Sequence, residues 1–214
     1  MRHRIETLRP QHLDEVVEVH LRAFKGFFVS FLGPKFLKEF YRSLSEDPEG
    51  IAFVALQENT NRVLGSVAGP LRPAGYFKAL LKRRWWAFGL SCIRAILRRP
   101  SILKRVLRAA FYRGDAAEGP PRALLTAISV LPETQGQGVG KALMDAFACE
   151  VRRRGGRGCF LTTDAQGNEA VNRFYAVCGW RLESTFTRPD GRTMNRYVLD
   201  FPDAVDPGPP RSDS

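Results

Sequence analysis

The feature of this 214-residue sequence that most limits how the chain can fold is a turn with three glycines, Gly136, Gly138 and Gly140. The turn lies between an apolar run, residues 123–130, and a helical pattern over residues 141–153. Glycines leave the backbone N–H groups of a turn accessible, and the N-terminal end of a helix adds positive potential at the same place. The strand, turn and helix therefore predict an α/β fold in which the turn binds a phosphate or diphosphate group.

Two common phosphate-binding motifs do not fit this turn. A Walker loop requires a glycine where the chain has Gln135, and a serine or threonine where it has Ala142. The dinucleotide fingerprint requires a different spacing of its third glycine and an acidic residue at the end of the next strand, and the chain has neither. The sequence thus excludes these two classes of nucleotide-binding protein.

A different known pattern does match. Gln135, Gly138 and Gly140 follow the spacing Gln-x-x-Gly-x-Gly, and about thirty residues later residues 168–180 read NEAVNRFYAVCGW. In this order and at this spacing the two segments resemble the acyl-CoA diphosphate signature and the second motif of the GNAT family of N-acetyltransferases. The resemblance extends over most of residues 4–200.

The resemblance implies an α/β fold with a mixed central sheet flanked by helices. It implies an acyltransferase that moves an acetyl group from acetyl-CoA, or another acyl group from its CoA thioester, to a primary amine by direct attack in a ternary complex. It also implies that the cofactor contacts the buried strand, the glycine turn and the second motif. These contacts involve Ile128, Ser129, Val130, Gln135, Gly136, Gln137, Gly138, Val139, Gly140, Lys141, Asn168 and Asn172.

The resemblance places the phenol of Tyr175 beside the sulfur of the thioester. A tyrosine with its ordinary pKa near 10 could protonate the leaving thiolate, whose own pKa is similar. The neighbouring Phe174 is expected in the core. Tyr175 is therefore the candidate catalytic acid.

The sequence does not identify the base that accepts the proton of the amine. The run 123–130 contains no acidic residue, and Glu133, Asp164 or a water relay remain as alternatives. Histidines stand in the N-terminal region but show no spacing typical of a metal site, and we assign them to the surface or the core. They are His3, His12 and His20.

The acceptor site in the family lies at the first two helices and their loop, where this chain carries four phenylalanines. These are Phe24, Phe27, Phe28 and Phe31, and they predict an aromatic-walled pocket that binds the substrate. The Phe-rich stretch is similar to GNAT relatives associated with surface polysaccharide synthesis, which implies a small-molecule acceptor such as an amino sugar. An N-terminal protein amine and a free amino acid stay open.

The chain departs from the family pattern in a basic segment. Residues 72–113 contain twelve of the 33 Lys and Arg residues and no acidic residue, so the net charge of +11 originates there. The periodicity predicts two amphipathic helices, over residues 83–99 and 101–112, in an insertion that spans residues 72–121 between the third and fourth strands. In the first helix, Trp85 and Trp86 fall on the apolar side and arginines on the other.

Three uses of this insertion compete: a basic face packed on the body of the protein, contact with an anionic membrane surface through residues 78–113, and binding of nucleic acid. Trp85 and Trp86 stand beside basic residues, a combination typical of helices at a membrane interface, which favours membrane over nucleic acid. A second class of function stays open as well, namely a CoA-binding or membrane-associated sensor on the same scaffold without turnover. The sequence leaves open whether the chain forms a homodimer.

The remaining organisation is that of one domain, residues 1–201, followed by an unstructured tail, residues 202–214. Four scattered cysteines without a CxxC pair indicate a reduced, cytoplasmic protein. No apolar run approaches the ~20 residues of a membrane span, so any contact with the inner membrane face would be peripheral. Besides the basic segment, the patterns predict helices over residues 11–24, 35–45, 141–153 and 168–177, and strands over 5–8, 51–56, 63–68, 123–130, 159–163, 180–186 and 193–199.

Overall fold

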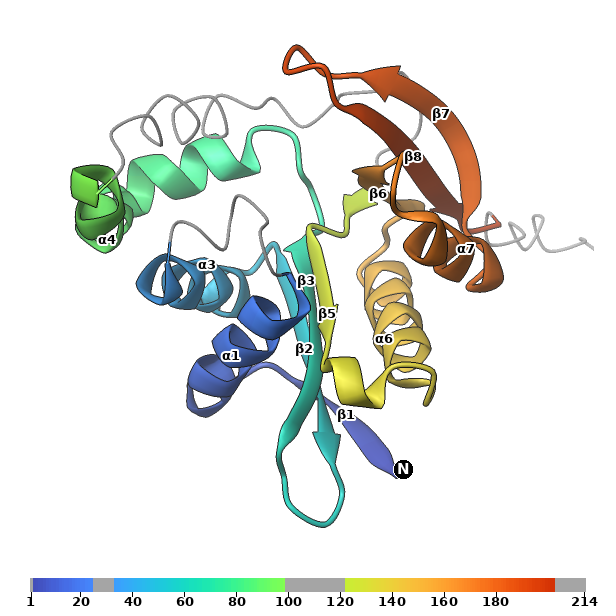
Figure 1. Cartoon of the computed structure of the whole chain (residues 1–214), viewed down its shortest axis with the longest axis horizontal. Coiled ribbons are helices and arrows are strands. Elements are labelled where there is room, and N and C mark those ends of the chain that lie inside the picture. The colour runs from blue at the N-terminus through green and yellow to red at the C-terminus, as the bar shows by residue number, and fades with distance from the viewer. Residues whose placement is uncertain (1, 25–32, 99–121, 203–214) are drawn as a thin grey trace, which may run out of the picture.

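The structure is a computed structural model that describes residues 2–24, 33–98 and 122–202 (Figure 1). Its strands form two four-stranded sheets, with the orders β1-β2-β3-β5 and β4-β6-β8-β7. All neighbours are antiparallel except β4 and β6, which are parallel. The strands are β1 (His3–Thr7), β2 (Gly50–Gln57), β3 (Val63–Pro70), β4 (Ala123–Leu124), β5 (Ala127–Val130), β6 (Gly158–Asp164), β7 (Arg181–Thr187) and β8 (Thr193–Asp200).

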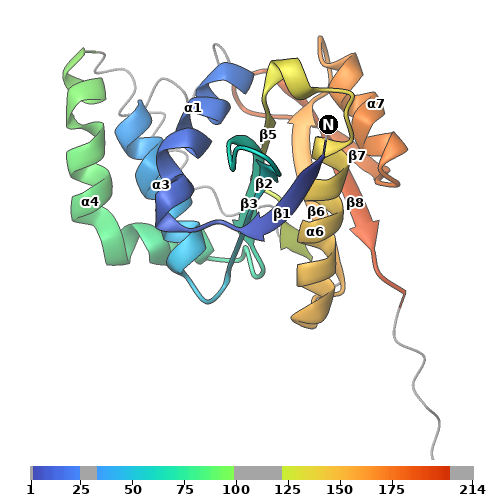
Figure 2. The same cartoon turned by 90° about the horizontal axis from the view of Figure 1, so that it is seen from below.

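Helices cover both faces of the first sheet. Figure 2 shows α1 and α3 on one face, α6 on the other, and α4 in a further layer outside α3. The described helices are α1 (Leu13–Ala23), α3 (Pro34–Glu46), α4 (Tyr76–Arg98), α6 (Val139–Arg153) and α7 (Glu169–Val177), with short 3-10 turns at Pro10–His12 and Pro132–Thr134. The mixed α/β fold predicted from the sequence is therefore confirmed.

The core lies where helical stripes meet the first sheet. In α6, Leu143, Phe147 and Val151 recur every four residues and are fully buried against the sheet. On the opposite face, Leu37 and Tyr41 of α3 are equally buried. Because the sheet is covered on both faces, every residue of β3 is buried. The predicted helices at residues 11–24, 35–45, 141–153 and 168–177 match α1, α3, α6 and α7 within one or two residues.

The prediction of one continuous strand over residues 123–130, buried on both faces, is wrong. The Leu125 N–H still donates to the carbonyl oxygen of Phe160 in the second sheet at 2.9 Å, but the Thr126 N–H donates to Ala68 in the first sheet at 3.0 Å. The chain thus passes from one sheet to the other between two adjacent residues. Most of β5 is only half-buried, because none of the described strands covers its second edge.

The predicted start of the first basic helix is also wrong. The helix begins at Tyr76 rather than Arg83 and has a kink at Arg84, where φ is −121° and ψ is 25°. Its buried side chains include Tyr76 and Phe88, whereas Trp85 and Trp86 are 69% and 58% exposed. The two tryptophans, which the periodicity placed on the apolar side of the helix, therefore face solvent and do not pack on the body of the protein.

Ion pairs with α3 explain this orientation. The Arg84 guanidinium lies 2.7 Å from a carboxylate oxygen of Glu39 and 2.6 Å from one of Glu46. Arg83 pairs with Asp47, directly after the end of α3. Acidic residues of α3 thus hold the two arginines on the inner side of the kink.

Several predictions fall outside the described residues. The second basic helix, residues 101–112, and residues 203–214 of the predicted tail lie there. The domain limits 1–201 and the insertion limits 72–121 stay predictions. Among the residues that the structure does describe, no helix combines the length and the apolar character needed to cross a membrane.

Candidate active site

The structure explains why a glycine is needed at each of the three positions in the turn before α6. Gly136 and Gly138 have φ angles of 77° and 83°, in the left-handed region that favours glycine. A Cβ atom added to either would have no neighbouring atom within 4 Å, so the space above the turn is open. At Gly140, in contrast, an added Cβ would lie 3.1 Å from the Cζ atom of Phe174. Gly140 therefore allows α7 to pack closely on the start of α6.

The turn presents several backbone donors that have no partner among the residues the structure describes. The Gln135 N–H donates to Pro132 at 3.3 Å and the Gln137 N–H to Thr134 at 3.4 Å, so these two predicted amides are engaged. The first amide bonded within α6 is that of Ala142. The amides that make no hydrogen bond to the described residues are those of Gly136, Gly138, Val139, Gly140 and Lys141.

Strand β5 has one unpaired edge. It pairs with β3 in the register Ser129 with Ser66, and the Leu131 N–H donates to Leu64 at 2.8 Å just beyond the strand. In an antiparallel ladder alternate residues face the partner, so Leu131 and Ser129 turn their peptide groups toward β3. The peptide groups of Ile128 and Val130 then face the opposite way, toward β6.

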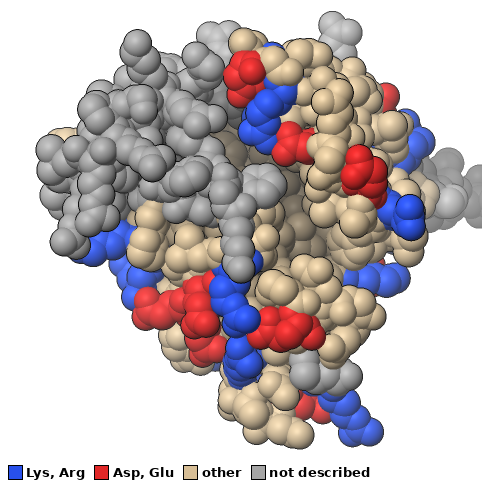
Figure 3. Space-filling view, viewed as in Figure 1, with Lys and Arg blue, Asp and Glu red and all other residues tan. Residues whose placement is uncertain are grey.

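Strand β6 offers a second unpaired edge across from the first. It pairs with β4 at Cys159 and Phe160, and in the described chain its residues from Leu161 to Asp164 have no strand on that side. Figure 1 shows β5 and β6 diverging, with α6 beside them. Figure 3 shows the surface hollowed near its centre, with a floor free of Lys, Arg, Asp and Glu and charged residues on the rim. The gap can hold an extended, uncharged ligand that pairs with both strand edges.

Tyr175 lies in α7 with its ring 5.5 Å from that of Phe174 and 5.6 Å from that of Tyr197. Burial, and to a lesser degree Cys178 and Tyr197, raises the pKa of Tyr175 above its usual value of 10. The expectation of an unperturbed pKa is therefore wrong. Its hydroxyl stays protonated at physiological pH, and the raised pKa makes it a weaker acid than the sequence prediction assumed.

The comparisons with known proteins identify the family. A sequence profile described as Acetyltransferase (GNAT) family matches residues 14–180. The chain belongs to this family. It is an acyl-CoA-dependent N-acetyltransferase, and its acyl donor is acetyl-CoA. No curated protein matches the sequence.

Solved structures share the GNAT fold at low sequence identity. The crystal structure of SsHAT has a TM-score of 0.63 and 20% identity, and the match covers 92% of this chain and 98% of that chain. The polyamine N-acetyltransferase of Drosophila melanogaster has a TM-score of 0.59 and 16% identity, with 94% and 100% covered. A putative GNAT acetyltransferase of Desulfovibrio desulfuricans has a TM-score of 0.56 and 19% identity, with 93% and 98% covered.

The two asparagines assigned to the cofactor in this GNAT chain are engaged to different degrees. Asn172 donates to the backbone oxygens of Asp164 and Asn168 at 3.0 and 2.9 Å. Its side-chain oxygen accepts a hydrogen bond from Asn195 at 3.0 Å. Asn168 donates to Thr163 at 2.7 Å, and its own side-chain oxygen receives no hydrogen bond from the described residues. Asn172 therefore holds α7 to β6 and β8, whereas Asn168 retains an acceptor for a ligand.

The structure disfavours both acidic candidates for the base of this GNAT enzyme. Glu133 lies 3.0 Å from Arg22 and 3.5 Å from Arg62. Its own backbone amide, followed by the charge of Arg22, lowers its pKa. Asp164 receives hydrogen bonds at 2.7 Å on both carboxylate oxygens from Arg192. The Glu133 carboxylate is thus stabilised in the charged form and accepts a proton poorly, whereas both carboxylate oxygens of Asp164 are already occupied by Arg192.

The acceptor side contains polar residues that sequence reasoning assigned no role. The ring of Phe24, the one described member of the predicted aromatic wall, lies 4.7 Å from that of His20. His20 Nδ1 in turn lies 2.9 Å from the Tyr41 hydroxyl. The sequence did contain one indication that His20 is buried, because His20 shares an apolar helical stripe with Val16 and Val17. The other predicted wall residues, Phe27, Phe28 and Phe31, lie outside the described residues.

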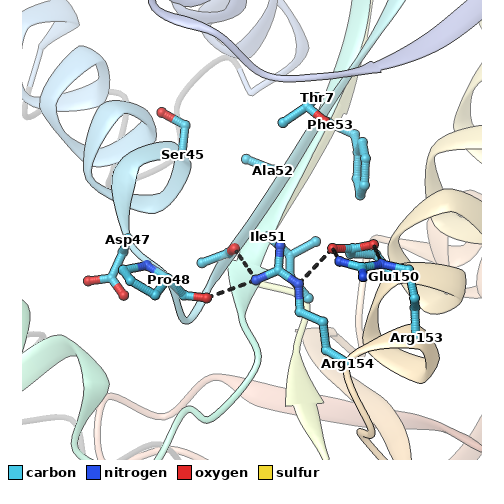
Figure 4. A pocket seen from close by; sticks show the side chains of 11 residues that line it. Thr7, Ser45, Asp47, Pro48, Ile51, Ala52, Phe53, Glu150, Arg153 and Arg154 are labelled. Carbon is cyan, nitrogen blue, oxygen red and sulfur yellow. Dashed lines mark hydrogen bonds and ion pairs between the residues drawn. The ribbon is translucent and has the colours of Figure 1, made fainter.

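A cavity elsewhere in the protein does not belong to this site. It has a volume of about 330 Å³ and lies between the C-terminal end of α6 and the start of β2 (Figure 4). Arg154 there donates to the backbone oxygens of Pro48 and Gly50 at 2.8 and 3.1 Å and pairs with Glu150 at 2.6 Å. The glycine turn lies at the other end of α6, roughly 20 Å along a helix of this length. The cavity is a structural junction between α3, β2 and α6.

Proposed function

We propose that this enzyme transfers the acetyl group of acetyl-CoA directly to a primary amine of a small molecule in a ternary complex, with an amino sugar as the acceptor. The observation that carries the proposal is the continuity of two features. In the described chain the free edge of β5 ends at Val130, and the unbonded amides of Gly136 and of residues 138–141 follow. A ligand with an amide-containing arm and a diphosphate matches both.

The glycine turn would hold the diphosphate of the cofactor. Its unbonded amides stand at the N-terminal end of α6, a 15-residue helix whose dipole favours an anion there. The peptide groups of Ile128 and Val130 would bond the amides of the uncharged arm. The floor of the gap, without charged side chains (Figure 3), fits such an arm.

The reaction would use few groups of the protein. Acetyl-CoA supplies the thioester carbonyl that the neutral amine attacks. A backbone N–H on the free edge of β5, such as that of Ile128, would donate to the carbonyl oxygen as negative charge develops on it. Tyr175, protonated at physiological pH, would donate its proton to the leaving sulfur, and the proton that the amine loses would pass to solvent through a water relay. Orientation of the amine would supply much of the remaining acceleration.

The aromatic wall supports an amino sugar as the acceptor. In the sequence, Phe24 is followed by the other predicted wall residues, Phe27, Phe28 and Phe31, which lie outside the described residues. Aromatic rings pack on apolar surface and attract an ammonium group, and a hexosamine offers both. The alternative acceptors are the amine of a peptide and the amine of a free amino acid.

A panel of amines tests the proposal. Purified protein and acetyl-CoA would be incubated with hexosamines, polyamines, amino acids and N-terminal peptides, and the release of CoA thiol would be measured. We expect acetylation of hexosamines above all other classes. Preference for another amine would refute the amino-sugar assignment. Tight CoA binding without transfer to any amine would favour a non-catalytic sensor.

One observation favours additional contact with a membrane surface. Trp85 and Trp86 are the most exposed aromatic residues of α4, and Lys82 beside them is exposed as well. Arg83 and Arg84 pair with acidic residues on or next to α3, so they contribute less to lipid binding than the sequence predicts. Co-sedimentation with phosphatidylglycerol vesicles should be salt-sensitive and should weaken in Trp85→Ala/Trp86→Ala. Equal binding to neutral vesicles would reject the anionic surface.

Whether the chain forms a homodimer is a separate question. Light scattering on the purified chain distinguishes a homodimer from a monomer.

A further inference from the structure

Four polar side chains from four elements meet inside the protein on the face of the first sheet that α1 and α3 cover. His20 Nδ1 lies 2.9 Å from the Tyr41 hydroxyl, and the hydroxyls of Ser66 and Ser129 lie 3.0 Å apart. Burial raises the pKa of Tyr41 to about 12, and interactions with the hydroxyls of Ser66 and Ser129 partly offset the rise. His20 is 5% exposed and the others at most 2%. We call these four residues the His20 network.

The network ends at the centre of β5. Ser66 and Ser129 are register partners in the β3–β5 ladder, and they also join their hydroxyls. Ser129 stands between Ile128 and Val130, the residues whose peptide groups face the gap. Any movement of Ser129 would therefore move both peptide groups.

Strand β5 needs such an anchor more than the other strands of its sheet. It has four residues, it pairs on one edge, and the chain enters it directly from the second sheet. Buried polar groups cost free energy unless they are bonded, and apolar side chains would pack α1 and α3 equally well. The polar network lies at the strand whose free edge forms one side of the candidate site.

We propose that His20 and Tyr41 are positioning residues for acyl transfer, which hold Ser129 and thereby aim the peptide groups of Ile128 and Val130 into the gap. The inference rests on the proposed function, because it assigns these peptide groups to the acyl donor. The ring of Phe24 lies 4.7 Å from that of His20, so the same network also supports the first residue of the acceptor wall. A misplacement of about 1 Å at a reacting group can cost roughly a hundredfold in rate.

Substitutions that remove single polar atoms test this inference. Tyr41→Phe deletes the central hydroxyl, and His20→Leu deletes the ring that bonds it. His20→Asn keeps a polar atom near the position of Nδ1. Tyr76→Phe is the matched control, because the Tyr76 hydroxyl is buried in α4 and has no hydrogen-bond partner among the described residues.

Three quantities would be measured for each folded variant: kcat with the preferred amine, the Kd for CoA, and amide hydrogen exchange of the peptide that covers residues 127–130. We expect Tyr41→Phe and His20→Leu to lower kcat at least about tenfold. Exchange over residues 127–130 should become faster. The Kd for CoA should rise by a smaller factor than kcat falls, because the diphosphate contacts of the glycine turn are untouched and only the arm contacts at Ile128 and Val130 weaken. His20→Asn should recover much of kcat, and Tyr76→Phe should behave as the wild type.

An unchanged kcat or unchanged exchange in folded Tyr41→Phe would overturn the inference. A parallel loss of kcat and CoA affinity would also overturn it, because that pattern indicates general loss of structure. If Tyr41→Phe does not fold, Ser66→Ala and His20→Leu carry the same comparison. If the wild type acetylates no amine, the proposed function fails, and the exchange measurement alone still decides whether the network anchors β5.

Discussion

The ring of Phe174 occupies the space in which a side chain at residue 140 would begin, since a Cβ atom on Gly140 would lie 3.1 Å from the ring atom Cζ. The last glycine of the turn is thus required by packing, whereas Gly136 and Gly138 are required by their positive φ angles. Through this contact the start of α6, which carries the unbonded amides, is joined to the helix that carries Tyr175.

Gly140→Ala should therefore weaken CoA binding. The added methyl group must displace Phe174 or the start of α6, and such overpacking typically costs about 1–3 kcal/mol. We expect an increase of at least about tenfold in the Kd for CoA, measured by calorimetry. Gly89→Ala is the control, because a Cβ at Gly89 would meet nothing within 4 Å. Equal affinity in both variants would show that the contact with Phe174 does not shape the cofactor site.

Tyr175→Phe should lower kcat at least about tenfold while the Kd for CoA stays unchanged. The reason is that the variant removes the proton donor but keeps the ring that packs on Phe174 and Tyr197. Because burial raises the pKa of Tyr175, the wild-type rate should show no loss from tyrosine ionisation up to about pH 10. Tyr197→Phe serves as the control. Full activity of Tyr175→Phe would remove this residue from the mechanism.

The protein should lose stability on mild acidification through His20. Burial lowers the pKa of His20 from 6.5 to about 4, so the unfolded chain binds the proton more readily. The contribution of the neutral ring is complete above about pH 6.5 and declines as the pH falls toward 4, by a total of about 3 kcal/mol.

Urea unfolding at several pH values between 7 and 4 checks this prediction. The difference in unfolding free energy between the wild type and His20→Asn should shrink as the pH falls. A difference that stays constant over this range would mean that His20 titrates normally in the folded protein.

The junction around Arg154 should affect stability but not the cofactor. Arg154 donates to the backbone oxygens of Pro48 and Gly50 and pairs with Glu150, so Arg154→Ala leaves acceptors unsatisfied. We expect a loss of about 1–3 kcal/mol in the free energy of unfolding, measured in urea. The Kd for CoA should stay unchanged. Arg152→Ala, at an exposed position of the same helix end, should be neutral, and an equal loss there would contradict the role of Arg154.

The local patterns of the sequence identified much of the fold and part of the site. Helical periodicity located α1, α3, α6 and α7, because an amphipathic stripe depends on neighbouring residues. The spacing of Gln135, Gly138 and Gly140, together with Tyr175 and its flanking residues, indicated the GNAT family, which the profile match confirmed. These patterns involve residues that are close in the chain, so a single sequence is enough to recognise them.

Features that depend on distant partners were missed or mistaken. An apolar run such as residues 123–130 does not record that its first half pairs with β6 and its second half with β3. Periodicity placed Trp85 and Trp86 on one side of the helix but left open what that side contacts. In the structure Arg84 pairs with acidic residues of α3, and the two tryptophans face solvent. Glu133 read as a candidate base until the fold brought Arg22 and Arg62 to it.

By itself the sequence determined the family, the glycine turn with its anion-binding character, and the position of Tyr175 one residue after a core phenylalanine. Only the tertiary structure decided which amides of the turn remain unbonded, which edge of β5 stays open, and that His20 and Tyr41 meet behind Ser129. The physical reason is the distance along the sequence over which each interaction acts. Backbone conformation and amphipathic faces follow from adjacent residues, whereas hydrogen bonds and ion pairs between elements exist only after the chain has brought those elements together.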